Sequence, residues 1–218
     1  MERLAGSGTP VVPLTRIPET PGALALTFDD GYRNFLEHGL PVLEKHRIPA
    51  TVFVVSGRCG GLNDWSHRYS ARTPRLELMS WSEVRQLGDA GVALGAHTVN
   101  HPDLARVPEA EAAREMRDCR RELEDRTGRP VEALAYPYGN STPAVRLLAR
   151  QEFRLACATT LRFLRGQEDP WNLPRIDAWY LGGAWRLDQL LKPGGRAYIA
   201  ARRWLRQLRA WLTEERGQ

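Results

Sequence analysis

Short apolar runs that alternate with helical segments constrain this chain more than any other feature of its sequence. Residues 23–30 (ALALTFDD), 50–56 (ATVFVVS) and 92–98 (VALGAHT) have the length and composition of strands. Between them, 33–46 predicts a helix interrupted near its proline, and a second helix runs from Ser80 to the glycine at 91. The runs are apolar on both faces, which predicts a mainly parallel sheet in an α/β fold.

The second half of the chain continues the pattern. Residues 108–127 predict a helix that ends at Gly128. Its apolar stripe consists of Ala112, Met116, Cys119 and Leu123. Then follow ALAYPYG (133–139), a helix from about residue 143, LACATT (155–160) and the short LPRI segment (173–176). Residues 57–79 have little periodicity, and a loop of that length is often a substrate-binding element.

Length and composition predict one globular domain over residues 1–218. The chain is 42% hydrophobic, which is enough to build a core without disulfides. Its three cysteines are widely and irregularly spaced, so we expect reduced and mostly buried thiols. The first twenty residues lack the apolar core of a secretory signal and any membrane span, so a cytoplasmic location is expected. No motif suggests a nucleic-acid partner.

The formal charge of +5 is concentrated near the C-terminus. The basic residues without an intervening acid are Lys192, Arg196, Arg202, Arg203, Arg206 and Arg209. Apolar residues recur among them at helical spacing, at Ala201, Trp204, Leu205, Leu208, Trp211 and Leu212. We expect this helix to dock on the rest of the fold, and contact with a membrane surface is the alternative.

Polar residues that could bind a metal or take part in catalysis lie at the carboxyl ends of the predicted strands, where parallel α/β folds place their active sites. Asp29 and Asp30 end the first strand, and two adjacent buried carboxylates require a cation or a proton. His97 and His101 follow a later strand at a spacing of four. One carboxylate with two imidazoles gives three protein ligands and open coordination positions, which is typical of a catalytic divalent metal.

Each of these patterns has a plain alternative. Adjacent aspartates commonly cap turns or helices, and a lone pair of histidines four residues apart is often coincidental. Their conjunction is more specific, because both lie at strand ends in the same alternating pattern. A third signal, YPYG at 136–139, ends the next strand.

The motifs TFDDG at 27–31 and HTVNH at 97–101 resemble the first and second motifs of the polysaccharide deacetylases, also called the NodB-homology or carbohydrate esterase 4 family. The resemblance covers about residues 21–177. It implies a distorted (β/α) barrel of mainly parallel strands with a metal at its mouth. Residues 178–218 would then form a C-terminal helical extension.

The resemblance also implies roles for residues. Asp30, His97 and His101 would hold the metal, usually zinc, with cobalt, nickel or iron(II) as alternatives. Asp29 would act as the base, and the backbone N–H of Tyr138 would bind the oxyanion. The implied function is removal of N-acetyl groups from an N-acetylated sugar or glycan by attack of a metal-bound water. Two alternatives remain open: hydrolysis of another small amide or imide, and carbohydrate binding with little turnover.

The third motif of the family is commonly RxPxG, and this chain departs from it. Residues 135–139 read AYPYG, with alanine in place of arginine, in a form that resembles one bacterial subgroup. Arg175 is the candidate for the missing cation, with Asp177 able to orient it. The alternative is a surface ion pair beside a strand.

The general acid is the second departure, because no histidine follows His101. His67, in the long loop, is one candidate for that role. Alternatively, Asp29 returns its proton to the leaving amine. Trp65, in the same loop, is a candidate for stacking on a sugar ring.

Overall fold

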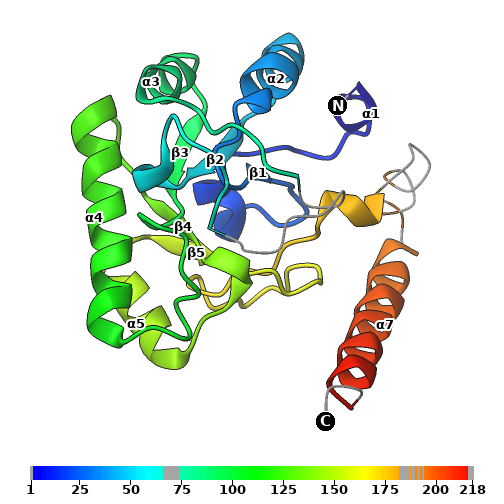
Figure 1. Ribbon diagram of the computed structural model, residues 1–218. Helices are drawn as coiled ribbons and strands as arrows, with labels where there is room; N and C mark the ends of the chain where they lie inside the picture. The colour runs from blue at the N-terminus through cyan, green and yellow to red at the C-terminus, as the bar shows by residue number, and fades with distance from the viewer. Residues whose placement is uncertain are drawn as a thin grey trace.

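The computed structural model describes residues 2–65, 74–181, 187, 190, 192 and 194–215. Its centre is one parallel sheet of five strands in the order β1-β2-β3-β4-β5. The strands are β1 (Leu26–Phe28), β2 (Ala50–Val54), β3 (Ala93–Ala96), β4 (Ala133–Ala135) and β5 (Leu155–Cys157). The sheet curls into a half-barrel, as Figure 1 shows, which confirms the fold expected from the alternating pattern.

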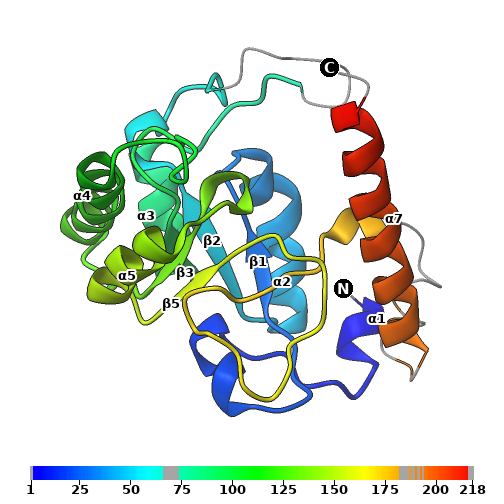
Figure 2. The ribbon, with the colours of Figure 1, turned by 90° about the horizontal axis from the view of Figure 1, so that it is seen from below.

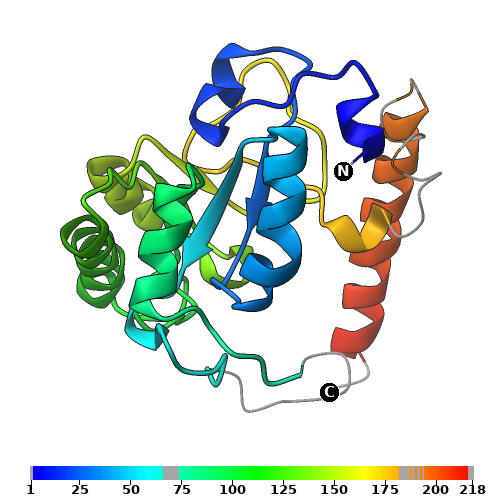
Figure 3. The ribbon, with the colours of Figure 1, turned by 90° about the horizontal axis from the view of Figure 1, so that it is seen from above.

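Helices lie on the outer side of the curled sheet (Figures 1 and 3). The long ones are α2 (Leu40–His46), α3 (Trp81–Asp89), α4 (Glu109–Thr127) and α5 (Pro143–Glu152). The shorter helical turns are α1 (Glu2–Ala5), η1 (Leu14–Glu19), η2 (Phe35–Gly39), η3 (Ser56–Arg58), η4 (Pro137–Gly139) and η5 (Ala178–Leu181). A last helix, α7 (Gly195–Glu215), follows the barrel (Figures 1 and 2).

The predicted helix signals are confirmed. Ser80 and Glu83 form a complete capping box at the start of α3, so the orphan N–H groups of its first turn have acceptors. Gly128 ends α4 in the left-handed conformation. The four apolar residues of the predicted stripe on α4 are fully buried in the layer between helices and sheet.

Strand β2 shows how the sheet separates two cores. Val52 and Val54 pack against the outer helices, while Phe53 points to the inner side of the barrel. Gly95 on β3 provides the space for that ring, because a Cβ at this position would lie 2.3 Å from Phe53. A larger residue at 95 would therefore displace the aromatic side chain that fills the barrel.

The segment after β5 brings the chain back toward β1. Leu173 pairs with Cys157 in parallel orientation, and the N–H of Ala158 donates to the Leu173 carbonyl at 2.8 Å. The N–H of Arg175 donates to the Thr160 carbonyl at 3.2 Å. Residues 173–176 thus continue the curvature of the sheet past β5.

Helix α7 docks through one side. Ile199 is 1% exposed and packs with Leu161 and Leu190. The helix therefore docks as expected, but Trp204 and Leu205 of the predicted apolar stripe are exposed. Among the described residues, no helix is both long and apolar enough to cross a membrane.

A buried carboxylate on α4 organises the loop that follows β3. The Oε2 atom of Glu115 accepts from the N–H groups of Val99 and Asn100, both at 2.8 Å, and its Oε1 accepts from Asn100 Nδ2 at 2.8 Å. Within this loop the N–H of His101 donates to Thr98 Oγ1 at 2.9 Å. Thr98 and His101 both have positive φ, so these contacts stabilise a backbone conformation that is otherwise unfavourable.

We predict that Glu115→Ala lowers the free energy of unfolding by about 2–3 kcal/mol, because the backbone donors at Val99 and Asn100 lose a charged acceptor. Glu115→Gln should cost less, since its carbonyl oxygen can still accept. Chemical denaturation measures both. Asp125→Ala, at an exposed site on the same helix, is the matched control, and equal losses at 115 and 125 would contradict the assigned role.

Candidate metal centre

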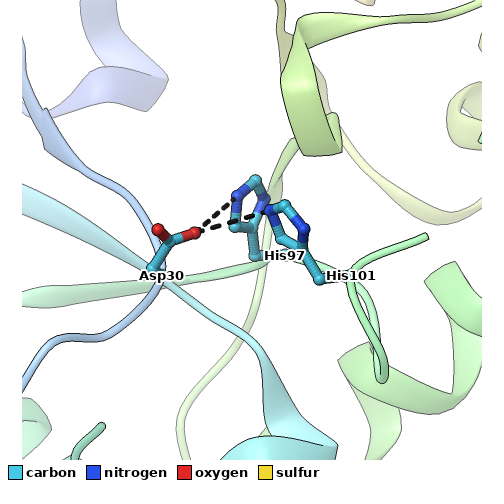
Figure 4. A group of neighbouring side chains, drawn as sticks. All are labelled: Asp30, His97 and His101. Atoms are coloured by element: carbon cyan, nitrogen blue, oxygen red, sulfur yellow. Dashed lines mark ion pairs between the residues drawn. The ribbon is translucent and has the colours of Figure 1, made fainter. Parts of the chain in front are cut away.

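Three side chains from different parts of the sequence meet at the carboxyl ends of the strands. Asp30 follows β1, His97 follows β3, and His101 lies one short turn later. Their ligand atoms all lie within 4.8 Å of one another. Asp30 Oδ1 is 3.3 Å from His97 Nε2 and 3.5 Å from His101 Nε2, and Figure 4 shows both imidazoles directed at this carboxylate.

The local backbone turns Asp30 toward the histidines. Asp30 and Gly31 both have positive φ, so the chain reverses sharply at the end of β1. The hydroxyl of Tyr32 donates to the Asp30 carboxylate, and Asn63 Nδ2 donates to the Tyr32 oxygen at 3.2 Å. Burial opposes the charge of Asp30, but the contacts with His97, His101 and Tyr32 prevail and lower its pKa.

His97 is fixed by its other ring nitrogen. Nδ1 lies 2.8 Å from the Ala135 carbonyl at the end of β4. A carbonyl only accepts, so Nδ1 carries the proton and donates, which leaves Nε2 facing Asp30. The neighbouring strand therefore sets both the tautomer and the ring orientation.

His101 is held by aromatic neighbours. The Trp65 ring stacks on it with centroids 4.5 Å apart, and the Tyr138 ring meets it edge-on at 4.8 Å. Burial, together with the charge of His97, lowers the pKa of His101 to about 4. Its imidazole is therefore neutral at physiological pH, which is the form that binds a metal.

Asp29 points to a different partner. Arg175 donates to it twice, from Nη1 to Oδ1 at 2.6 Å and from Nη2 to Oδ2 at 2.8 Å. The same guanidinium donates from Nε to the Ala158 carbonyl at 3.0 Å. Burial raises the pKa of Asp29, but the charges of Arg175 and His97 outweigh it, and the net shift is downward.

The sequence also suggested Tyr138, Asp177 and His67 for the site, and they differ in where they lie. Tyr138 borders the site, has positive φ, and its carbonyl accepts from Thr159 Oγ1 at 3.3 Å. Asp177 accepts from the N–H of Trp179 at 2.8 Å, so it caps the next turn, and it acts on Arg175 only as a nearby charge. His67 lies outside the described residues.

Three residues with a supporting role were not predicted from the sequence. Tyr32 and Asn63 contact Asp30 directly or through one hydrogen bond, and Glu115 organises the turn between the two histidines. Tyr32 had a local signal, since it follows the aspartates by two residues. Asn63 and Glu115 are distant in sequence from the residues that they contact, so no local spacing identifies them.

A hollow of about 680 Å³ opens beside the cluster. Trp65, His101 and Tyr138 contribute to its wall, together with polar side chains such as Asn100 and Asp103. An aromatic and polar lining next to a cluster of ligand atoms is typical of a substrate site. Since one face of Trp65 stacks on His101, this ring both supports the cluster and lines the hollow.

The donor set fits a divalent metal. One carboxylate oxygen and two imidazole nitrogens converge, and His97 Nδ1 is bonded to a carbonyl, as is usual for metal-bound histidine. Three protein ligands would leave positions for water or substrate. Asp29 lies beside the cluster, and both of its carboxylate oxygens accept from Arg175.

Comparison with solved structures supports the same architecture. A deacetylase of Streptococcus pyogenes, PplD in complex with acetate, superposes with a TM-score of 0.67 at 22% identity, over 80% of this chain and 76% of that one. The structure of IcaB from Ammonifex degensii gives a TM-score of 0.67 at 26% identity, over 84% of each chain. The fold is thus shared with both of these proteins.

Sequence comparison identifies the family. Chitin deacetylase of Colletotrichum lindemuthianum is 31% identical over 110 residues, which is 50% of this chain and 38% of that protein. A chitooligosaccharide deacetylase of Sinorhizobium fredii is 28% identical over 159 residues, 70% of this chain and 61% of that protein. The chain thus spans less than two thirds of the length of these relatives. The family model for polysaccharide deacetylase matches residues 16–153, and the chain belongs to this family.

Proposed function

We propose that this protein removes N-acetyl groups from an N-acetylated sugar or glycan by metal-dependent hydrolysis. The observation that carries the proposal is the convergence of Asp30, His97 and His101 beside the Asp29 carboxylate. Membership of the polysaccharide deacetylase family supports an N-acetylated carbohydrate as substrate. The named relatives, a chitin deacetylase and a chitooligosaccharide deacetylase, support the same class.

The three donors would hold the metal, and zinc is the ion we propose, because imidazole with one carboxylate suits it. Such an ion lowers the pKa of water and polarises the acetamide carbonyl. Asp29 stays ionised beside Arg175 and can accept the proton of the attacking water. The backbone N–H of Tyr138, at the edge of the site, is our candidate donor to the oxyanion.

The leaving amine needs a proton, and Asp29 is our first candidate to return it. Among the described histidines, His38 and His46 lie on η2 and α2, and the His38 side chain is largely exposed. Neither is a candidate for the acid. His67 remains the alternative predicted from the sequence.

We predict that the protein binds about one divalent metal per chain and that His97→Ala or His101→Ala abolishes stable binding, because two remaining ligands seldom retain zinc. Elemental analysis after dialysis measures the occupancy. His38→Ala is the matched control and should keep full occupancy. Full occupancy in the His97→Ala, His101→Ala double variant would remove the metal centre from the proposal.

We predict acetate release by the zinc- or cobalt-loaded protein from at least one substrate in a panel of N-acetylated sugars, sugar nucleotides and oligosaccharides. Asp29→Asn should lower that rate on the order of a hundredfold or more, because the base is lost while the metal ligands remain. Metal content, measured in parallel, should be unchanged. No acetate from the whole panel with metal bound would favour a binding protein, and an undiminished rate in Asp29→Asn would assign the base elsewhere.

We predict that Arg175→Met raises the kinetic pKa of the base and moves the acidic limb of the pH–rate profile to higher pH. The reason is that the guanidinium stabilises the ionised form of Asp29, so its removal favours the protonated form. Arg175→Lys should shift the limb less, since the charge is kept and the bidentate geometry is lost. An acidic limb at the same pH in Arg175→Met would leave Arg175 a purely structural residue.

A further inference from the structure

Two asparagines on the wall of the hollow are each held by a carboxylate. Asn100 and Asn140 are exposed, and both line the hollow beside the metal centre. Asn100 Nδ2 donates to Glu115 Oε1 at 2.8 Å, and Asn140 Nδ2 donates to Asp103 Oδ2 at 3.0 Å. Glu115 belongs to α4, whereas Asp103 lies in the loop that follows His101. The same arrangement therefore occurs twice at one site, with carboxylates from different parts of the fold.

These contacts fix the direction of each amide. A carboxylate has acceptors only, so the amino group of each asparagine must be turned toward it. The carbonyl oxygen of the same amide then points in another direction. Because both side chains are exposed at the hollow, Asn100 Oδ1 and Asn140 Oδ1 are available there to accept hydrogen bonds.

The two carboxylates are themselves held by the backbone. Glu115 Oε2 accepts from the N–H groups of Val99 and Asn100, both at 2.8 Å. Asp103 Oδ1 accepts from the N–H of Ala105 at 3.1 Å, and the Asp103 side chain is only 17% exposed. The amides are thus oriented before any ligand arrives, which lowers the entropy cost of binding one.

The charges on the wall of the hollow balance. Arg58 Nη1 lies 3.2 Å from Asp64 Oδ1, and Arg106 Nε lies 3.4 Å from Asp103 Oδ2. These two pairs account for the charged side chains among the described residues of the lining, since the imidazole of His101 is neutral at physiological pH. A wall without net charge is complementary to a neutral ligand.

Sugar hydroxyls are the groups that suit this wall. Each hydroxyl of a pyranose can donate one hydrogen bond, and the two amide oxygens can accept. Trp65 and Tyr138 add aromatic surface for the C–H groups of a sugar ring. A charged sugar would need a free charge of opposite sign, whereas the arginines and aspartates of the wall already pair with one another.

We propose that the hollow binds one neutral sugar unit of the substrate and that Asn100 and Asn140 accept hydrogen bonds from its hydroxyl groups. Glu115 and Asp103 are positioning residues, because they orient the amides. The inference rests on the proposed function, since it describes the sugar that carries or adjoins the acetylated amine. It predicts weaker binding of sugars that lack a hydroxyl group or carry an anionic group.

Asn100→Ala and Asn140→Ala test the two acceptors. The probes are a trisaccharide of N-acetylglucosamine and its analogues in which one hydroxyl is replaced by hydrogen. Each variant should raise KM for the trisaccharide about three- to tenfold with kcat nearly unchanged, because one hydrogen bond is lost. Gln151→Ala, which changes an exposed amide on α5, is the matched control and should keep the wild-type KM. Circular dichroism and metal content show whether each variant stays folded.

The decisive readout is the coupling between a variant and a missing hydroxyl. If Asn140 accepts from a hydroxyl, loss of either group weakens binding, and loss of both weakens it no further. For at least one deoxy analogue, Asn140→Ala should therefore change KM by less than about twofold. The same holds for Asn100→Ala and its own hydroxyl. A residue that only supports the fold would raise KM by the same factor for every probe.

Calorimetry on the metal-loaded Asp29→Asn variant separates this inference from the proposed function, because binding needs no turnover. The two asparagine substitutions are then made in that background. Trisaccharide binding that both substitutions weaken, without acetate release by the wild type, would support the inference and contradict deacetylation. Acetate release with wild-type KM in both single variants would overturn the inference and leave the proposed function intact.

Three further results would overturn the inference. The first is an equal rise in KM for the trisaccharide and for every deoxy analogue. The second is tighter binding of a phosphorylated trisaccharide than of the neutral one. The third is a lack of binding by any neutral N-acetylated sugar to the metal-loaded Asp29→Asn protein.

Discussion

Two adjacent carboxylates at the end of β1 impose the constraint on which the site depends. Asp29 and Asp30 are both partly removed from water, with side chains 35% and 18% exposed, so each ionised carboxylate is stabilised by a partner of opposite charge or a hydrogen-bond donor. The fold gives each carboxylate its own partner: Arg175 comes from the segment after β5, and the histidines come from the loop after β3. Each carboxylate thus has its own attractive contact, which offsets the repulsion between the two. In the function that we propose, Asp30 is a metal ligand and Asp29 is the base.

Backbone strain is concentrated around the same carboxylates. Among the described residues other than glycine, positive φ occurs at Asp30, Arg47, Thr98, His101 and Tyr138. All but Arg47 lie at the site. Each such residue costs on the order of 1 kcal/mol or more, so surrounding contacts must offset it. Glu115 does this for the histidine loop, and Thr159 contacts the carbonyl of Tyr138.

Much of this arrangement could be predicted from the sequence, because strand ends in a parallel sheet meet at one edge whatever their exact register. Asp30, His97 and His101 could therefore be brought together from spacing, motif and strand order. Arg175 was inferred as the replacement for an absent arginine, and the structure brings it to Asp29. Its role in tuning the base remains a prediction.

Other features depend on contacts that no local pattern encodes. In the sequence, Glu115 cannot be distinguished from the other acidic residues of a solvated helix. Its role follows only from the packing of the loop after β3 against it. The apolar spacing of α7 predicted docking, but periodicity cannot tell which neighbour an apolar stripe faces. In the structure, the docking contact is made by Ile199, which packs with Leu161 and Leu190, and not by the predicted stripe.

The position of Arg175 has a consequence for the order in which the site is assembled during synthesis. All three proposed metal ligands lie within the first 101 residues, whereas the partner of Asp29 follows 74 residues after His101. A nascent chain can therefore present its ligand residues well before the charge that balances the neighbouring aspartate has left the ribosome. Until then Asp29 lacks the guanidinium that it contacts in the complete fold. The proposed metal ligands and the partner of the proposed base would then become available at different times in the life of each molecule.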